Sequence, residues 1–319
     1  KEDNNNLYYY TKKLIYGLIL ASFIAILLNF FFPLNKPINS ILIIICTVIL
    51  FFNWKKYFNK EYLLFITLSG ILISLLIIVS NVYRPDAGLY HLPYIGILNS
   101  EKIIVGISNL HTRYGLISIT QYLSAITNNY IFGENGIVFA QALIANAVIL
   151  NFSFQIFKYN KIQKYNFHFF LILFCFIYFF YKMNRYSEYG NDAPAHYLLF
   201  FLISELILQK EKFKLNDFLN NLLLSLFIIQ SKLTLIFLIF FHLINIKNLK
   251  ISSLIINFKF YFLVFFTFIW IFKNILTTGC VLYPIKTTCI SSLNWVDIKK
   301  VEAVSESAEV WTKGWSDQS

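Results

Sequence analysis

The chain has 319 residues, of which 58% are hydrophobic and only 13% charged, and its formal net charge is +11 at pH 7. So apolar a composition excludes an ordinary soluble domain, and the basic residues form no single patch that would fit a nucleic acid. The sequence also lacks a glycine-rich phosphate loop, a nucleophile elbow and a Cys-x-x-Cys zinc spacing.

Long apolar runs predict an all-α fold, a polytopic membrane helix bundle. A crossing needs about 20 largely apolar residues, and the runs give about nine crossings. They are residues 14–32, 38–53, 62–80, 136–157, 167–181, 195–209, 218–230, 233–246 and 254–273. The first run is long enough to span and lacks a cleavage site after it, so we expect an anchor rather than a signal peptide.

Lysines recur in every second connection between these runs. The basic connections hold Lys12 and Lys13; Lys55, Lys56 and Lys60; Lys158, Lys161 and Lys164; Lys210, Lys212 and Lys214; and Lys247 and Lys250. By the positive-inside rule these connections and the N-terminus are cytoplasmic. The connections 33–37, 81–135, 182–194, 231–232 and 274–319 then face outward. Within the last run, Lys259 and Lys273 are expected to snorkel.

The largest outward connection, residues 81–135, contains two short apolar stripes, 89–98 and 114–126. Both are too short to cross a membrane, so we expect amphipathic helices lying at the outer interface. We assign residues 1–273, with this connection, to one transmembrane bundle.

Residues 274–319 form a separate outward segment. Its two cysteines, Cys280 and Cys289, could pair in an oxidising compartment. Because the chain begins with Lys and stops in polar sequence, we expect a fragment whose outer domain is truncated.

A polar segment from Arg84 to His91 follows the third predicted crossing. If it starts a helix, Asp86 and Tyr90 share a face while His91 turns partly away. Ionisable groups at membrane depth mark substrate paths, so Asp86 is a candidate catalytic acid, with Tyr90 and His91 as candidates for substrate binding. The alternative is that Asp86 only caps a helix, with Arg84 as its surface partner.

A second polar segment, residues 191–196, precedes the sixth crossing. Asp192 is expected to cap that helix at the positive end of its dipole, and its position on the same outer face as Asp86 makes it the second catalytic candidate. His196 would share its helical face and is a further candidate for substrate binding. A packing role is the alternative for His196, and we do not expect it to bind metal.

Three cations on the outer face could bind a phosphate group. Arg84 and Arg113 have the planar guanidinium that suits two-pronged phosphate contact. Lys232 lies in the tight outward turn between two apolar runs, where a snorkelling role is the alternative.

The order of these elements resembles the GT-C class of membrane glycosyltransferases. It consists of an acid at the start of a long outer loop, then Tyr90, His91 and Pro93, interface helices, and a second loop acid at Asp192. That class includes protein O-mannosyltransferases, aminoarabinose transferases and oligosaccharyltransferase catalytic subunits. The stretch 278–284 looks like a Gly-x-x-Leu-Tyr-Pro element of uncharacterised bacterial members, and the resemblance covers about residues 62–295.

The resemblance implies an inverting transferase of a bacterial inner membrane that moves a sugar from a polyprenyl-phosphate carrier to an acceptor at the outer face. By position, Asp86 matches the first-loop acid, a general base or metal-holding group, and Asp192 matches the second-loop acid of some members. Several members place a second acid where this chain has Ala87, which weakens the case for a divalent ion held by Asp86 and Asp192. No other cofactor is implied.

Two other functions fit the same composition. A transporter or flippase of a lipid-linked or anionic solute would need broken or charged segments at mid-membrane, whereas the runs here are mostly unbroken. An O-antigen polymerase-like enzyme would depend on outer-loop arginines more than on an acid. The sequence leaves open the sugar, the acceptor and the oligomeric state.

Overall fold

The computed structural model describes residues 7–53, 60–79, 85–116, 118–182, 189–209, 214–246 and 251–313. Over these residues the protein is all-α, with 13 α-helices and no strand, which confirms the predicted fold class. The helices are α1 (Leu7–Asn29), α2 (Lys36–Phe52), α4 (Lys60–Val79), α5 (Leu92–Ser100), α6 (Ile119–Thr127), α7 (Ile137–Lys161), α8 (Phe167–Lys182), α9 (Asp192–Gln209), α10 (Leu215–Ser231), α11 (Leu238–Ile246), α12 (Ile251–Ile255), α13 (Phe258–Thr278) and α14 (Ile298–Lys313). Short helical segments connect them, among them the π-helix η1 (Ala87–His91) and the 3-10 helices η2 (Ile107–Asn109), η3 (Thr112–Leu116) and η6 (Leu233–Leu235).

Local sequence sets where several helices begin and end. The Asn35 side chain caps α2, and Ser118 with Gln121 forms a capping box at the start of α6. Asn257 caps α13, which ends at Gly279 with a left-handed φ of 75° that suits glycine. These caps satisfy backbone groups at the helix ends, so the polar segments next to them lie outside the helices.

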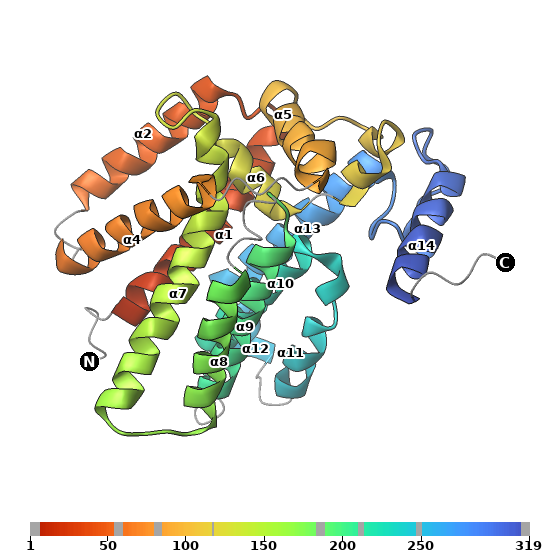
Figure 1. The fold of residues 1–319 in the computed structure, drawn as a ribbon. Helices are drawn as coiled ribbons and strands as arrows, with labels where there is room; N and C mark the ends of the chain where they lie inside the picture. Colours follow the sequence, from red (N-terminus) through yellow and green to blue (C-terminus); the bar gives the residue numbers. More distant parts are fainter. Residues whose placement is uncertain are drawn as a thin grey trace.

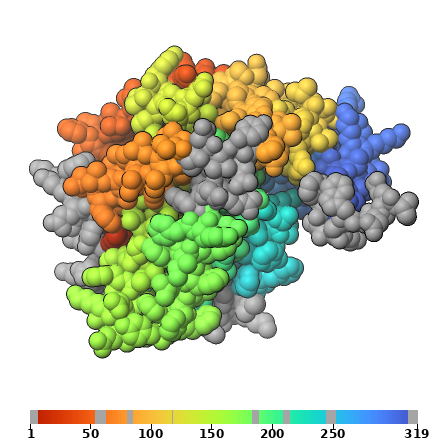
Figure 2. All heavy atoms as spheres, viewed as in Figure 1, coloured from red at the N-terminus to blue at the C-terminus, as the bar shows by residue number. Residues whose placement is uncertain are grey.

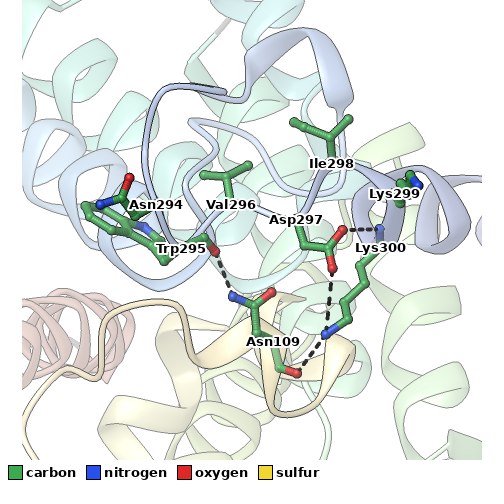
Figure 3. Close-up of a pocket in the computed structure, with 8 residues that line it drawn as sticks. All are labelled: Asn109, Asn294, Trp295, Val296, Asp297, Ile298, Lys299 and Lys300. Carbon is green, nitrogen blue, oxygen red and sulfur yellow. Dashed lines mark hydrogen bonds and ion pairs between the residues drawn. The ribbon is translucent and has the colours of Figure 1, made fainter.

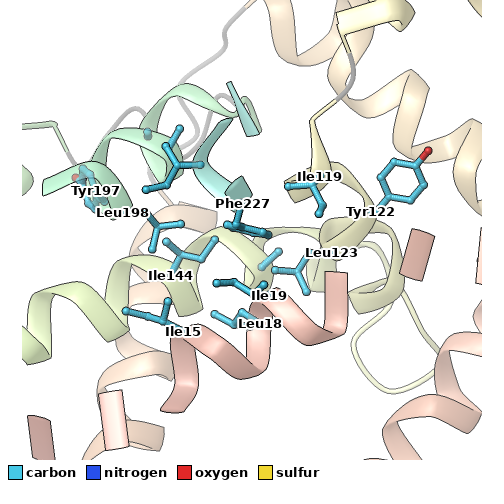
Figure 4. Close-up of a cluster of buried hydrophobic side chains, with 14 of the residues drawn as sticks. Ile15, Leu18, Ile19, Ile119, Tyr122, Leu123, Ile144, Tyr197, Leu198 and Phe227 are labelled. Carbon is cyan, nitrogen blue, oxygen red and sulfur yellow. The ribbon is translucent and has the colours of Figure 1, made fainter. Parts of the chain in front are cut away.

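Helix α7 runs through the middle of the bundle and contacts α1, α4, α6, α8 and α9 (Figure 1). Figure 4 shows the apolar side chains that meet there from five helices. They include Ile19 of α1, Tyr122 of α6, Ile144 of α7, Tyr197 of α9 and Phe227 of α10, each at most 1% exposed. Dense packing of this kind stabilises helix association in a bilayer, where exclusion of water contributes little.

The predicted count of nine spans is wrong by the criteria of length and apolarity. Among the described residues, three helical stretches are long and apolar enough to cross a membrane: Leu7–Asn29, Glu134–Lys161 and Phe258–Thr278. The other apolar runs do form helices, but α2 has 17 residues and α8 has 16. At 1.5 Å per residue, 17 residues reach about 26 Å, less than the roughly 30 Å hydrocarbon core. The run 233–246 divides into a 3-10 turn and a nine-residue helix.

Large apolar side chains cover the outside of α2 and α4. Ile44 and Phe52 of α2 are 57% and 81% exposed, and Leu64 and Leu72 of α4 are 60% and 58% exposed. Figure 2 shows the α4 side chains on the outside of the molecule. Contiguous apolar surface of this kind is suited to lipid rather than to water.

The predicted interface helices exist, but they are not surface elements throughout. Residues 87–100 form η1 followed by α5, and residues 112–127 include η3 and α6. In α6, Ile119, Tyr122 and Ala125 have no exposed surface, because the helix packs between α1 and α7. The second stripe is therefore part of the core.

Candidate functional site

The start of α9 and the end of α10 lie side by side. Lys232, which follows α10, places its Nζ 2.8 Å from Oδ1 of Asp192 in α9. Asp192 is the first residue of α9, where a negative charge is favoured by the helix dipole. The Asp192 side chain is 46% exposed and that of Lys232 is 26% exposed. The pair is thus half-open to solvent.

Asp86 does not cap a helix. Its backbone has helical angles, φ −62° and ψ −32°, and its side chain makes no capping bond. Instead the Asp86 carboxylate lies close enough to the Tyr90 hydroxyl, one turn further on, to act on its pKa. Burial and this carboxylate raise the pKa of Tyr90 above its ordinary value, Arg113 opposes the shift and Asp192 adds to it. The Arg113 guanidinium lies 5.7 Å from the centre of the Tyr90 ring.

His91 is held between two polar neighbours. Its Nδ1 is 3.1 Å from Nε2 of Gln121, whose Oε1 accepts a hydrogen bond from the Ser118 N–H, and this bond fixes the amide orientation. A Cβ placed on Gly190 would lie 3.1 Å from His91 Nε2, so the glycine lets this backbone approach the ring. Burial lowers the pKa of His91 to about 4, although Asp86 and Asp192 both act to raise it. The imidazole is therefore neutral at pH 7.

Six of the eight predicted site residues come together at one end of the bundle. Asp86 and Asp192 both act electrostatically on Tyr90 and His91, as does Arg113, and Lys232 pairs with Asp192. We call this group the end site: Asp86, Tyr90, His91, Arg113, Asp192 and Lys232. It joins η1, η3, α9 and α10, and its first and last residues, Asp86 and Lys232, are more than a hundred positions apart in the chain.

The remaining two predicted residues are not part of this group. Arg84 lies outside the described residues. His196 borders a small hollow together with Tyr178 and Lys182 of α8.

The segment after α13 packs against the end site. Cys280 and Cys289 form a disulfide, as the sequence suggested they could. The Tyr283 ring lies so close to Gly115 that a Cβ there would be 2.5 Å from it. Burial raises the pKa of Tyr283 to about 12, and nearby Arg113 opposes the rise. The disulfide-closed loop is thus adjacent to the cation of the end site.

A shallow hollow of about 530 Å³ lies farther along this segment, and Figure 3 draws the residues that line it. Asn109 Nδ2 donates to the Trp295 carbonyl at 2.7 Å, and Lys300 Nζ lies 3.3 Å from the Asn109 carbonyl oxygen. These bonds hold the start of α14 to the η2 turn. Neither this hollow nor the one beside His196 is lined by Asp86, Asp192 or Lys232.

Sequence reasoning missed a charged group at the opposite end of the bundle. Lys12 Nζ is 2.6 Å from Glu205 Oε2, and the Tyr8 hydroxyl donates to Glu205 Oε1 at 2.7 Å. The signal was present, since Glu205 is a lone acid within an apolar run. We call Tyr8, Lys12 and Glu205 the opposite-end cluster.

Metal binding by the end site finds little support in its donor set. Within the described part of the chain, no three His, Cys, Asp or Glu side chains gather closely enough to hold a metal ion. The carboxylates of Asp86 and Asp192 have a phenol, an imidazole and two cations as neighbours instead. Such a set is suited to proton transfer and to binding an anion.

The fold and the end site define the class: an all-α protein whose three candidate spans indicate a membrane protein, with a polar site at one end of the bundle. The chain belongs to the family described as Domain of unknown function (DUF8201), whose model matches residues 2–319. No curated protein and no solved structure matches the chain.

Proposed function

We propose that this protein is a GT-C-like membrane glycosyltransferase. It transfers a sugar from a polyprenyl-phosphate carrier to an acceptor at the outer face of a bacterial inner membrane. The observation that carries the proposal is the convergence of two carboxylates, two cations, a phenol and a neutral imidazole from four separate elements. This set supplies both a base and an anion-binding group, which transfer from a lipid phosphate requires.

Four residues of the end site have a role in this reaction. The exposed Asp86 carboxylate takes the proton from the acceptor hydroxyl as that oxygen attacks the anomeric carbon. Arg113 and Lys232 stabilise the lipid phosphate that departs with the electrons of the broken bond. Asp192 orients Lys232 through their 2.8 Å ion pair. A single displacement of this kind inverts the anomeric centre.

The disulfide supports the outward assignment of the end site. Disulfides persist in oxidising compartments and are rare in the cytoplasm. The Cys280–Cys289 loop carries Tyr283, which packs on Gly115 of η3, two residues from Arg113. The loop and the end site therefore share one side of the membrane.

A substitution of Asp86 tests the transferase directly. Purified protein in lipid vesicles is incubated with a panel of radiolabelled polyprenyl-phosphate sugars, and release of sugar from the lipid is measured. We expect Asp86→Asn to lower the rate by about 10²–10⁴-fold, the usual contribution of a general base. Glu101→Gln changes an exposed acid of the same connection outside the end site and is the matched control. Equal rates for Asp86→Asn and the control would refute the assigned role.

The sidedness has its own test. A Cβ at Gly88 has no heavy atom within 4 Å, so Gly88→Cys is sterically free. In a Cys46→Ser background we expect an impermeant thiol reagent to label it from outside intact cells. Labelling only after permeabilisation would place the end site in the cytoplasm and contradict the proposal.

A transporter of a lipid-linked solute is the second candidate, and the opposite-end cluster favours it. Ionisable groups inside a bundle can mark a path through it, and Glu205 is only 1% exposed. A transporter would move a labelled lipid-linked sugar across the vesicle membrane without breaking its glycosyl bond. That product distinguishes the two functions.

A further inference from the structure

Lys273 of α13 is a buried cation without a polar partner. Its side chain has 0% exposure, and among the described residues its Nζ has no hydrogen-bond partner. The centre of the Trp270 ring lies 3.8 Å from Nζ. The expectation that Lys273 snorkels to the interface is therefore wrong.

An unpaired buried ammonium carries a large desolvation cost. A cation–π contact contributes only about 2 kcal/mol even when desolvated, which does not offset that cost. Ionisable residues inside membrane helices are rare and usually serve function. The Lys273 side chain thus combines full burial with unused hydrogen-bond donors, as expected of a group that binds an anion.

A second unsatisfied group lies on the neighbouring helix α10. Gln230 of α10 is 4% exposed, and neither its Nε2 nor its Oε1 has a hydrogen-bond partner in the described structure. α10 and α13 are in contact, and Leu219 and Leu263 near their starts belong to one buried cluster. At 1.5 Å per residue, Gln230 and Lys273 lie about 15 Å beyond those leucines.

Both helices lead to the end site. α10 ends beside Lys232, and α13 contacts η3, which carries Arg113. We propose that Lys273 and Gln230 form an anion subsite below Arg113 and Lys232 that binds the phosphate head of the lipid carrier. Phosphate oxygens accept hydrogen bonds from the ammonium and from the amide N–H. The inference deepens the proposed function, because the lipid-linked donor comes from that proposal.

A binding experiment tests the subsite without requiring turnover. Purified full-length chain in detergent is titrated with a long-chain polyprenyl monophosphate that carries no sugar, and in a separate arm with inorganic phosphate. We expect Lys273→Met to weaken lipid binding about 10- to 100-fold, as for a lost hydrogen bond to a charged group. Its unfolding midpoint without lipid should equal or exceed that of the parent, because an unpaired buried charge is removed. Lys259→Met is the matched control, because this exposed lysine lies at the other end of α13 and bonds the half-buried Asn220 of α10.

The other outcomes separate the subsite from the transferase. Lipid binding by Lys273→Met equal to the parent's would overturn the subsite, as would a parent protein that binds neither ligand. If inorganic phosphate binds as tightly as the polyprenyl monophosphate, the lipid is not the source of the bound anion. If Lys273→Met does not fold, Gln230→Leu decides, and undiminished binding by that variant overturns the subsite. A parent that binds lipid but releases no sugar supports the subsite and refutes the transferase.

Discussion

The two ends of the bundle hold their charges in different ways. In the opposite-end cluster the Glu205 side chain is 1% exposed, and both its oxygens are bonded, to Lys12 at 2.6 Å and to Tyr8 at 2.7 Å. In the end site the Asp192 side chain is 46% exposed and pairs with Lys232 at 2.8 Å, while Asp86 is exposed.

The difference separates a structural group from a binding group. A carboxylate that is 1% exposed, with a hydrogen bond at each oxygen, is closed to a ligand from solvent, and it ties α9 to α1. A half-exposed carboxylate keeps acceptor sites that a substrate can use. A charged side chain in this bundle therefore indicates a binding site only where it is open to solvent and can accept a further hydrogen bond.

The largest expected effect is on the opposite-end cluster. Glu205→Gln should destabilise the protein by about 3 kcal/mol or more, because it leaves Lys12 without its counter-ion between two helices. Denaturant unfolding of the purified protein measures the loss. The double variant Lys12→Met with Glu205→Leu should recover most of it. An unchanged midpoint in Glu205→Gln would remove the structural role and strengthen the transporter alternative.

Acidification should weaken the end site through His91. Its pKa is about 4 in the folded protein and ordinarily 6.5, so the unfolded chain binds the proton first as the pH falls. Stability present above pH 6.5 is then lost progressively toward pH 4, by at most about 3 kcal/mol. Unfolding midpoints between pH 7.5 and 4.5 should fall less in His91→Gln than in the parent. His111→Gln on the same connection is the control, and identical pH profiles for all three would exclude His91.

Loss of the disulfide should act on the outer segment. Replacing both Cys280 and Cys289 by Ser should cost about 2–3 kcal/mol, the value expected for a closed loop of about ten residues. We expect faster proteolysis within residues 280–313 while the bundle stays folded. Dithiothreitol should reproduce the effect in the parent and add nothing in the double variant, and equal proteolysis of the two proteins would contradict it.

The smallest expected effect on stability is that of breaking the ion pair between Asp192 and Lys232 in the end site. Asp192→Asn should change the free energy of unfolding by less than about 1 kcal/mol, because exposed ion pairs contribute little. It should nevertheless slow sugar release, since Lys232 loses the group that orients it. A loss as large as that of Glu205→Gln would show that the two ends do not differ as described.

Much of the fold follows from the apolar runs, because each predicted crossing coincides with a helix. The count of spans does not follow, because runs such as 38–53 and 167–181 form helices of only 17 and 16 residues, and a turn at Leu233–Leu235 divides the run 233–246. Burial of α6 could not be predicted either. Its 9 residues are apolar enough for an interface or a core, and only contact with α1 and α7 decides between them.

The end site was predictable in part because polar residues are scarce in this chain and stand out. Asp86, Asp192 and Lys232 lie between apolar runs, and the structure brings them together. The burial of Lys273 does not follow from the sequence, because a lysine near a helix end usually snorkels. Its side chain is enclosed by the tertiary packing of α13, which the sequence does not reveal.

The contact between Tyr283 and Gly115 restricts how this family can vary. The ring fills the volume that any larger residue at position 115 would occupy, so the two positions share one fixed amount of space. Relatives that gain bulk at position 115 should carry a smaller residue at position 283. Paired substitution of that kind would mean that the C-terminal loop and the η3 turn evolve as a unit.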